Sequence, residues 1–312
     1  VHKDNNETKD LSVGKFDIGL PASYVTMNTT QFPLLWLSVF GNATGGLALL
    51  SSSKMVLTDI WQGISPEIVT SSFATGYVSA LGAGMAVGRF GWSAISDYIG
   101  RRNTYALFGL GIPIVGSIPT LAHAASTAAH NGGSSDVFPL LMMFYGSSIL
   151  AITFYGGIFS ILPAYIADLF GQCHAGAIHG KALTAWSSSA VVGPMGLAYL
   201  RSRSLEDAMV GLLNHVEDTD AFEQAFGCTL DDSEMIQVLI DAKTITIPRL
   251  MEVVPQGTVD PTPFLYDTTF YAAAGLMGLS FMANLFIQPL DVKHTLKTLE
   301  QKKKEKEKEN ER

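Results

Sequence analysis

Six stretches of the chain are apolar over the length of a membrane span. An α-helix needs roughly 20 mostly apolar residues to cross about 30 Å of hydrocarbon. The stretches are 32–51, 69–87, 103–122, 137–167, 182–200 and 268–290, and none of them contains Asp, Glu, Lys or Arg. A helix at the surface of a soluble protein keeps a polar face. The pattern therefore predicts an all-α integral membrane protein with six transmembrane helices forming one bundle, 32–290.

Polar segments flank and interrupt this bundle. Residues 1–31 are polar and of mixed charge, which is typical of a solvated linker. Residues 201–267 form an insertion in which apolar residues recur at helical spacing from Leu205 to Val216 and again from Met235 to Ile240. We expect two or three short amphipathic helices that form an external cap. Residues 291–312 are dense in Lys and Glu and predict a charged, solvated tail.

Composition and charge argue against several classes of function. Hydrophobic residues make up 47% of the chain and charged residues 15%. The net charge of -8 comes mostly from the insertion, so it indicates neither a nucleic-acid partner nor an acidic substrate. Cys173 and Cys228 are too few for a disulfide framework or a metal site, and we expect neither a metal nor a cofactor. The spans hold no nucleophile, carboxylate or metal-ligand motif, so we do not expect an enzyme.

The basic residues of the short loops predict the orientation. Arg89, Arg101 and Arg102 lie between the second and third spans, and Lys181 between the fourth and fifth, whereas the two short loops on the other side, 52–68 and 125–136, hold only Lys54. Basic residues in short loops favour the cytosol. We therefore expect both termini to be cytosolic, in a membrane that the sequence does not identify. Because the chain begins with Val1, we also expect that it is truncated at its amino end.

The segment from Gly88 to Arg102 concentrates charge in a loop between two apolar runs. A tight turn between antiparallel helices favours Gly100, which takes backbone angles that other residues avoid. Asp97 is placed to accept hydrogen bonds from the amino end of a neighbouring helix, for which the helix starting near Gly176 is our candidate. Such a contact forms in one conformation and breaks in another, as a conformational latch requires.

This segment resembles the signature of the major facilitator superfamily. Its Asp-x-x-Gly-Arg-Arg pattern is similar to the cytosolic loop that joins the second and third helices of each six-helix half in that superfamily. In that setting Arg101 and Arg102 are expected to face anionic headgroups or Asp168. Ser93 stands where the pattern usually has Gly, and Tyr98 where it usually has a basic residue.

A closer resemblance is to the oxalate/formate antiporter branch, which is related to the monocarboxylate transporters. It is carried by Gly88-Arg89 with Trp92, Tyr155–Gly157, Leu162–Gly171, Gly176–Lys181, Thr184–Ser187, Gly193-Pro194 and Asp260–Asp267. The resemblance implies that the six helices are the seventh to twelfth of a twelve-helix fold. The chain would then be its carboxy-terminal half, and the amino-terminal six-helix half is an expected partner beside the lipid bilayer.

The resemblance implies a secondary active transporter of a small organic anion that works by alternating access around a site at the membrane midplane. A dicarboxylate such as oxalate calls for two cations. Arg89 is the only basic residue near the second span, and the fifth span holds Trp186, Ser187 and Ser188 but no Lys or Arg. A monocarboxylate of the formate or lactate type is an equal alternative. Symport, antiport and coupling to a proton all stay open.

Four residues are candidates for substrate contact. Arg89 either pairs with a carboxylate or extends to the membrane surface. Tyr155 and Trp186 either line the cavity or serve as packing, and Asn42 is costly in lipid unless it faces protein or water. His179, near the cytosolic mouth, is a proton relay or an ordinary loop residue. The rival function is a transporter-like sensor or binding protein without transport activity, which the large insertion favours.

Overall fold

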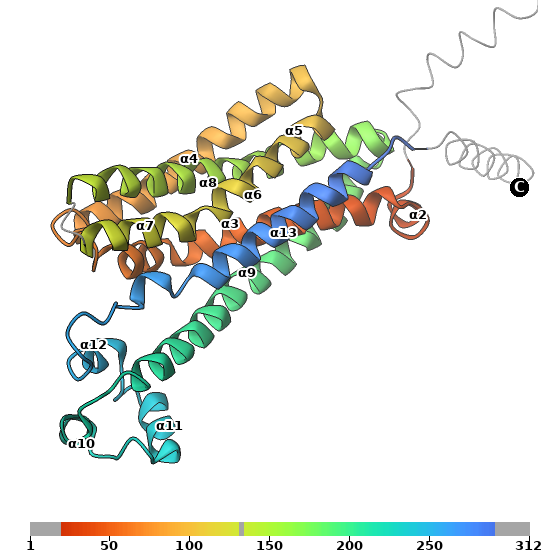
Figure 1. Cartoon of the computed structure of the whole chain (residues 1–312). Coiled ribbons are helices and arrows are strands. Elements are labelled where there is room, and N and C mark those ends of the chain that lie inside the picture. Colours follow the sequence, from red (N-terminus) through yellow and green to blue (C-terminus); the bar gives the residue numbers. More distant parts are fainter. Residues whose placement is uncertain (1–19, 131–133, 291–312) are drawn as a thin grey trace, which may run out of the picture.

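The computed structural model describes residues 20–130 and 134–290, and within these ranges every regular element is a helix (Figure 1). The expectations for residues 1–19 of the linker and for the tail 291–312 lie outside the described residues. The elements, in chain order, are α2 Ala22–Asn28, α3 Gln31–Trp61, α4 Ser71–Ile99, α5 Arg101–Leu107, η2 Phe108–Leu110, α6 Gly111–Gly116, α7 Ile118–His130, α8 Ser134–Phe170, α9 Ala175–Leu213, α10 Thr219–Phe226, α11 Ser233–Asp241, α12 Ile247–Leu250, η3 Thr262–Phe264 and α13 Asp267–Phe286.

Four helical segments of the described chain are long and apolar enough to cross a membrane. They are Gln31–Trp61, Arg101–His130, Val137–Phe170 and Thr262–Phe286. The chain therefore has the make-up of a multi-pass integral membrane protein. The helices α4 and α9, with 29 and 39 residues, are equally long but are diluted by Gly, Ser and Thr. For these two the expectation of a span stays a prediction.

The helices continue past the apolar stretches that predicted them. α3 runs through Lys54 and Asp59 to Trp61, although the first span was expected to end at Ser51. α4 runs to Ile99, so the charged segment expected as a loop is helical on both sides of Gly100. The length of an apolar stretch reflects the thickness of the hydrocarbon that it crosses. The helix itself can continue through polar residues beyond the hydrocarbon until a stop signal such as Gly100.

The third apolar stretch is not one straight helix. It consists of α5, η2, α6 and α7, and Pro113 and Pro119 lie near the starts of α6 and α7. Proline has no N–H to donate to the preceding turn, and its ring clashes with the carbonyl four residues earlier. α8 nevertheless keeps Pro139 and Pro163 inside one helix of 37 residues.

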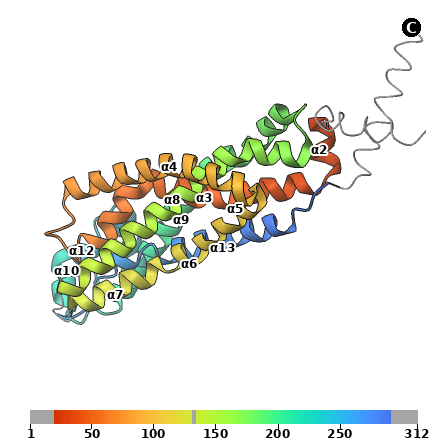
Figure 2. The same ribbon diagram turned by 90° about the horizontal axis from the view of Figure 1, so that it is seen from above.

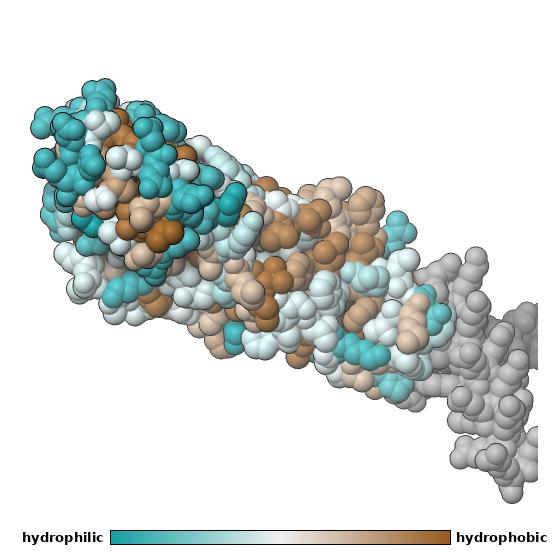
Figure 3. All heavy atoms as spheres, turned by 90° about the horizontal axis from the view of Figure 1, so that it is seen from below, coloured by the Kyte–Doolittle hydropathy of each residue, from teal (hydrophilic) through white to brown (hydrophobic). Residues whose placement is uncertain are grey.

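The long helices form an elongated bundle in which α3 packs between α9 and α13, and α4 packs along α8 (Figures 1 and 2). One end carries α2, the α4–α5 turn and the α8–α9 connection; we call it the arginine end, after Arg101 and Arg102. The other end carries the cap, which we define as residues 201–267. In Figure 3 hydrophilic side chains gather over the cap, while hydrophobic ones are more frequent along the bundle.

The cap corrects one detail of the sequence interpretation. Its first predicted helix is the continuation of α9, which passes Arg201 and ends only at Leu213. The second predicted helix is confirmed as α11, whose first turn is capped by the Asp232 side chain accepting from the Met235 N–H. Cys228 is buried in the cap, which raises the pKa of its thiol, and Cys173 is exposed in the α8–α9 connection.

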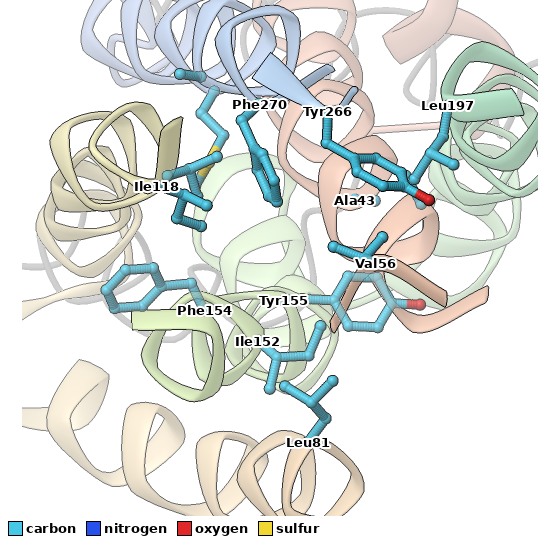
Figure 4. Packing of buried hydrophobic residues seen from close by; sticks show 14 of the residues in the cluster. Ala43, Val56, Leu81, Ile118, Ile152, Phe154, Tyr155, Leu197, Tyr266 and Phe270 are labelled. Carbon is cyan, nitrogen blue, oxygen red and sulfur yellow. The ribbon is translucent and has the colours of Figure 1, made fainter. Parts of the chain in front are cut away.

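The bundle interior is filled by large apolar and aromatic side chains from every long helix. Figure 4 shows Phe154 and Ile152 of α8 facing Ile118 of α7 and Leu81 of α4, with Tyr266 and Phe270 on the α13 side. This packing holds α8 at the centre of the bundle. Residues on α8 are consequently positioned against several helices at once.

Candidate functional site

Close packing of α4 on α8 positions Arg89. Gly88 lies against the backbone carbonyl of Thr153, and Gly156 lies against that of Met85, so neither glycine has room for a Cβ. The Trp92 indole Nε1 donates to Thr153 Oγ1 at 3.1 Å. The two helices are thereby fixed in register, and Arg89, next to Gly88, lies beside α8.

Packing of α9 on α3 positions Trp186. A Cβ on Gly193 would lie 2.6 Å from the Thr44 carbonyl oxygen, so α9 approaches the α3 backbone closely there. Ser189 Oγ donates to the Phe40 carbonyl at 3.1 Å, and Trp36 Nε1 of α3 donates to Thr184 Oγ1 at 2.8 Å. With this face of α9 against α3, Trp186 is left to face α8.

These contacts bring three helices together around a cavity of about 440 Å³, which we call the Arg89 cavity. It is lined by Arg89 of α4, by Tyr155, Phe159 and Ser160 of α8, and by His179, Leu183 and Trp186 of α9. Arg89, Tyr155 and Trp186, three of the four residues proposed from the sequence, thus meet in one place. The sequence analysis missed Phe159, Ser160 and Leu183; Phe159 and Leu183 lie one helical turn from Tyr155 and Trp186, respectively.

The aromatic residues of the Arg89 cavity form a connected wall. Trp186 Nε1 donates to the Tyr155 hydroxyl at 3.2 Å. The Phe159 ring packs edge-to-face against both partners, with centroid distances of 5.1 Å to Tyr155 and 6.0 Å to Trp186. Gly46 of α3 makes room for the Tyr155 ring, because a Cβ there would lie 2.6 Å from it. The wall is therefore preorganised rather than loosely packed.

The cavity is cationic. Arg89 is exposed and close enough to Tyr155 to interact electrostatically with it, and it forms no ion pair with any carboxylate in the part of the chain that the structure describes. Burial lowers the pKa of His179 below its ordinary value, which favours the neutral imidazole. The cavity therefore offers guanidinium donors beside neutral polar groups, a combination that suits a carboxylate.

Asn42 does not join this site. Asn42 is 5% exposed and lines a separate, smaller cavity of about 50 Å³, with Ser148 of α8 and Thr269 of α13. It faces the protein interior, as the cost of a polar group in lipid requires. Asn42 does not lie beside Arg89, Tyr155 and Trp186, so the structure gives no support to its prediction as a substrate contact.

The latch segment is arranged differently from the expectation. Asp97 does not cap α9; it pairs with Arg101, across the turn at Gly100, whose φ of 88° is a value that glycine adopts readily. Asp97 and Arg101 are four residues apart in the sequence, and the turn at Gly100 between them brings their side chains together. Arg101 Nε also lies 3.8 Å from the Asp168 carboxylate at the end of α8, one of the two partners expected for it.

Arg102 turns to another helix. Its Nη2 donates to the carbonyl of Leu285 at 2.7 Å, near the carboxyl end of α13, where unpaired carbonyls attract a cation. In return Asn284 Nδ2 donates to the Arg102 carbonyl at 2.9 Å, and Tyr165 donates to Asn284 Oδ1 at 3.1 Å. The α4–α5 turn is thus tied to both α8 and α13.

A second arginine centre lies at the cap end and was not predicted. Arg201 of α9 donates to Asp59 Oδ2 of α3 from Nη2 at 2.7 Å and from Nε at 3.1 Å, and its Nε lies 2.8 Å from the Tyr266 hydroxyl. Tyr266 in turn donates to Asp59 Oδ2 at 2.8 Å. The sequence shows Asp59 and Arg201 only as isolated charges beyond two apolar stretches. Their pairing required knowing that α3 and α9 are neighbours.

Comparison with known proteins finds one distant similarity at the level of sequence. The chain is similar to a transporter. It is 24% identical over 170 residues to the oxalate:formate antiporter of Oxalobacter formigenes, an alignment that covers 54% of this chain and 35% of that protein. The matched region thus spans about a third of the length of the curated relative. No protein-family profile matches the chain. The similarity is distant, and it is to a membrane carrier rather than to an enzyme.

Proposed function

We propose that the chain is the carboxy-terminal six-helix half of a major facilitator transporter that moves a small organic anion by alternating access. The distant similarity to an antiporter and the four long apolar helices support a carrier. The observation that carries the proposal is the Arg89 cavity, in which an arginine without a carboxylate partner in the described chain lies beside a hydroxyl and an indole.

In this proposal α4 and α9 are the remaining two spans. Both helices contribute polar side chains to the Arg89 cavity, namely Arg89 from α4 and His179 and Trp186 from α9. Polar groups within a membrane bundle face its interior or a water-filled path rather than lipid. The amino-terminal six helices of the complete fold would close the cavity from the opposite side.

Arg89 is assigned to the carboxylate of the substrate. A guanidinium presents two parallel N–H donors that match the two oxygens of a carboxylate. Since this half supplies one unpaired cation to the Arg89 cavity, a monocarboxylate is satisfied by it alone. A dicarboxylate would take its second cation from the amino-terminal half.

The arginine end is assigned to the cytosol, because Arg101 and Arg102 directly follow the turn at Gly100 there and Lys181 lies in the second turn of α9. The cap is long enough to be translocated regardless of its charge. Asp97 and Arg101 form the breakable part of a latch, since the Asp97 side chain is 64% exposed and an exposed ion pair contributes little to stability. The contacts of Arg102 with α13 form its fixed part.

The test is uptake of labelled formate, lactate, pyruvate and oxalate into proteoliposomes that contain the full-length gene product, with and without a pH gradient. Parent protein is compared with Arg89→Gln, and with Arg203→Gln as a control, because Arg203 pairs with Glu206 on the surface of the cap. We expect saturable uptake of at least one anion by the parent and the control, and its loss in Arg89→Gln.

Three results would contradict the proposal or redirect it. Absence of uptake of all four anions by correctly inserted protein would remove the carboxylate assignment. Saturable binding of an anion without uptake would identify the transporter-like sensor instead. Uptake that survives in Arg89→Gln would leave a carrier but move its substrate site away from the Arg89 cavity.

A further inference from the structure

The cap contains a cavity of its own, at the opposite end of the molecule from the Arg89 cavity. Its volume is about 350 Å³, and its walls come from the extension of α9, the α11–α12 connection and the residues around η3. Most of its lining is aliphatic, and Met209, Ile245, Ile247 and Leu265 are buried there. The cationic residues that line it are Arg201 and Lys243.

Lys243 has an unusual backbone conformation. Its φ of 56° makes it the one residue other than glycine with a positive φ in the part of the chain that the structure describes. It follows α11 in a Schellman turn, in which the Lys243 N–H donates to the Ile240 carbonyl at 2.9 Å and the Thr244 N–H to the Leu239 carbonyl at 2.8 Å. Glycine usually occupies this position because a Cβ makes the conformation costly.

Where other described helices are followed by a residue with a positive φ, that residue is glycine. Gly171 follows α8 with a φ of 87°, and Gly227 follows α10 with a φ of 75°. The backbone conformation therefore gives no reason for a lysine at this position. Strain of this kind is typical of residues that serve a site.

The connection that carries Lys243 is held in place. Arg249 donates from Nη1 to the Thr244 carbonyl and from Nη2 to the Ala225 carbonyl, both at 2.9 Å. Its guanidinium also lies 4.9 Å from the centre of the Phe226 ring. Arg249 thereby links the α11–α12 connection to α10. The cavity is therefore preformed and does not depend on a ligand for its shape.

Charge in the cap singles out this cavity. Residues 201–267 contain thirteen acidic and four basic residues, and two of the four basic residues line the cavity. The guanidinium of Arg201 is committed to Asp59 and Tyr266. Lys243 forms no ion pair with any residue that the structure describes. One ammonium group thus remains for a ligand, next to an aliphatic wall.

We propose that the cap cavity binds a small monocarboxylate with an apolar body. Its carboxylate pairs with Lys243, and its apolar part contacts the aliphatic lining. The cavity lies near the lower end of the size range of small-molecule pockets. Oxalate does not suit it, because oxalate has two charges and no apolar part. The inference is independent of the transport proposal, since it uses none of the residues of the Arg89 cavity.

The experiment measures binding of 4-fluorophenylacetate to the purified full-length gene product by fluorine NMR, with the neutral amide 4-fluorophenylacetamide as a matched probe. All proteins carry Arg89→Gln, so that the Arg89 cavity contributes no charge-assisted binding. Into this background we introduce Lys243→Gly, Lys243→Arg and, as a control, Arg203→Gln. Lys243→Gly removes the ammonium but suits the backbone, so its melting temperature is expected to equal or exceed that of the background protein.

We expect saturable binding of the acid and at least about tenfold weaker binding of the amide, as a charge-assisted hydrogen bond requires. Lys243→Gly should weaken binding of the acid by about the same factor, while Lys243→Arg and Arg203→Gln retain it. The proposal is overturned if the background protein shows no saturable binding, if acid and amide bind equally, or if folded Lys243→Gly binds the acid as tightly as the background protein.

Discussion

Two arginines at opposite ends of the bundle show how similar residues reach different roles. Arg201 has its hydrogen-bond acceptors within the fold. It donates two hydrogen bonds to Asp59 and one to the Tyr266 hydroxyl, which itself donates to Asp59. Arg89 has a tyrosine and a tryptophan nearby but no carboxylate in the described chain. A cation whose charge is balanced within the fold serves structure. A cation that is left unbalanced in a cavity is available to an anionic ligand.

The pKa of Arg201 illustrates the balance. Burial alone would lower it, but the hydrogen bond to Asp59 and the neighbouring groups outweigh burial and raise it. The guanidinium therefore stays charged and bonded. Both centres depend on α9, which carries Trp186 in the Arg89 cavity and Arg201 in the cap-end cluster.

The largest effect is expected for Arg89→Gln. Removal of one charge-assisted, bidentate contact to a carboxylate should reduce uptake at low substrate by about 100-fold, that is, by about 3 kcal/mol. The melting temperature should stay at the parent value, because Arg89 forms no ion pair within the described chain that the substitution would remove. Equal losses of uptake and stability would mean that Arg89 is structural, like Arg201.

Arg201→Gln should show the reverse pattern. The variant leaves Asp59 partly buried without its cation, and we expect a loss of about 2 kcal/mol in stability, less than for a fully buried pair because both side chains remain partly exposed. Thermal unfolding of Arg201→Gln, Asp59→Asn and the double variant measures the coupling. If the two single losses simply add, the pair is not the stabilising unit that its geometry indicates.

Gly156→Ala should disturb the Arg89 cavity without changing any of its polar side chains. The new methyl group meets the Met85 carbonyl and forces α4 away from α8, at a cost of about 1–3 kcal/mol. Uptake is expected to fall because Arg89 moves relative to Tyr155. Gly82→Ala is the matched control, since no atom lies within 4 Å of a Cβ there. Equal behaviour of the two variants would show that α4–α8 packing does not position Arg89.

Trp186→Phe keeps a ring in the wall but removes the N–H that donates to Tyr155. The expected loss is about 1 kcal/mol, or roughly fivefold in uptake, as for one neutral hydrogen bond. Tyr155→Phe should have a similar effect, and the double variant should lose less than the sum. Strict additivity would show that the two side chains act separately on the substrate.

His179 should give the smallest effect. Its pKa is lowered by burial, so the folded chain binds this proton less readily than the unfolded chain does. The stability associated with neutral His179 is fully present above the ordinary pKa and is lost as the pH falls from there through the folded pKa. His179→Gln should therefore lower the difference between the melting temperatures at neutral pH and at about pH 5. An unchanged difference would show that His179 is effectively solvated.

Features that depend on consecutive residues were open to prediction from the sequence. Apolar length and helical spacing indicated the long helices and α11, because both properties are visible along one segment. The glycine turn at Gly100 was predicted for the same local reason. Arg89, Tyr155 and Trp186 were proposed as one site from residue type, charge and family resemblance, and the structure places them around one cavity.

Features that depend on neighbouring helices were decided only by tertiary structure. The sequence could not show that Asp59 meets Arg201 or that Asn42 lies apart from the Arg89 cavity. The physical reason is that a polar side chain takes its partner from whichever helix packs against it. Which helix that is, and how each helix is rotated, depends on close approaches such as those at Gly88 and Gly156, where the backbones of two distant segments touch.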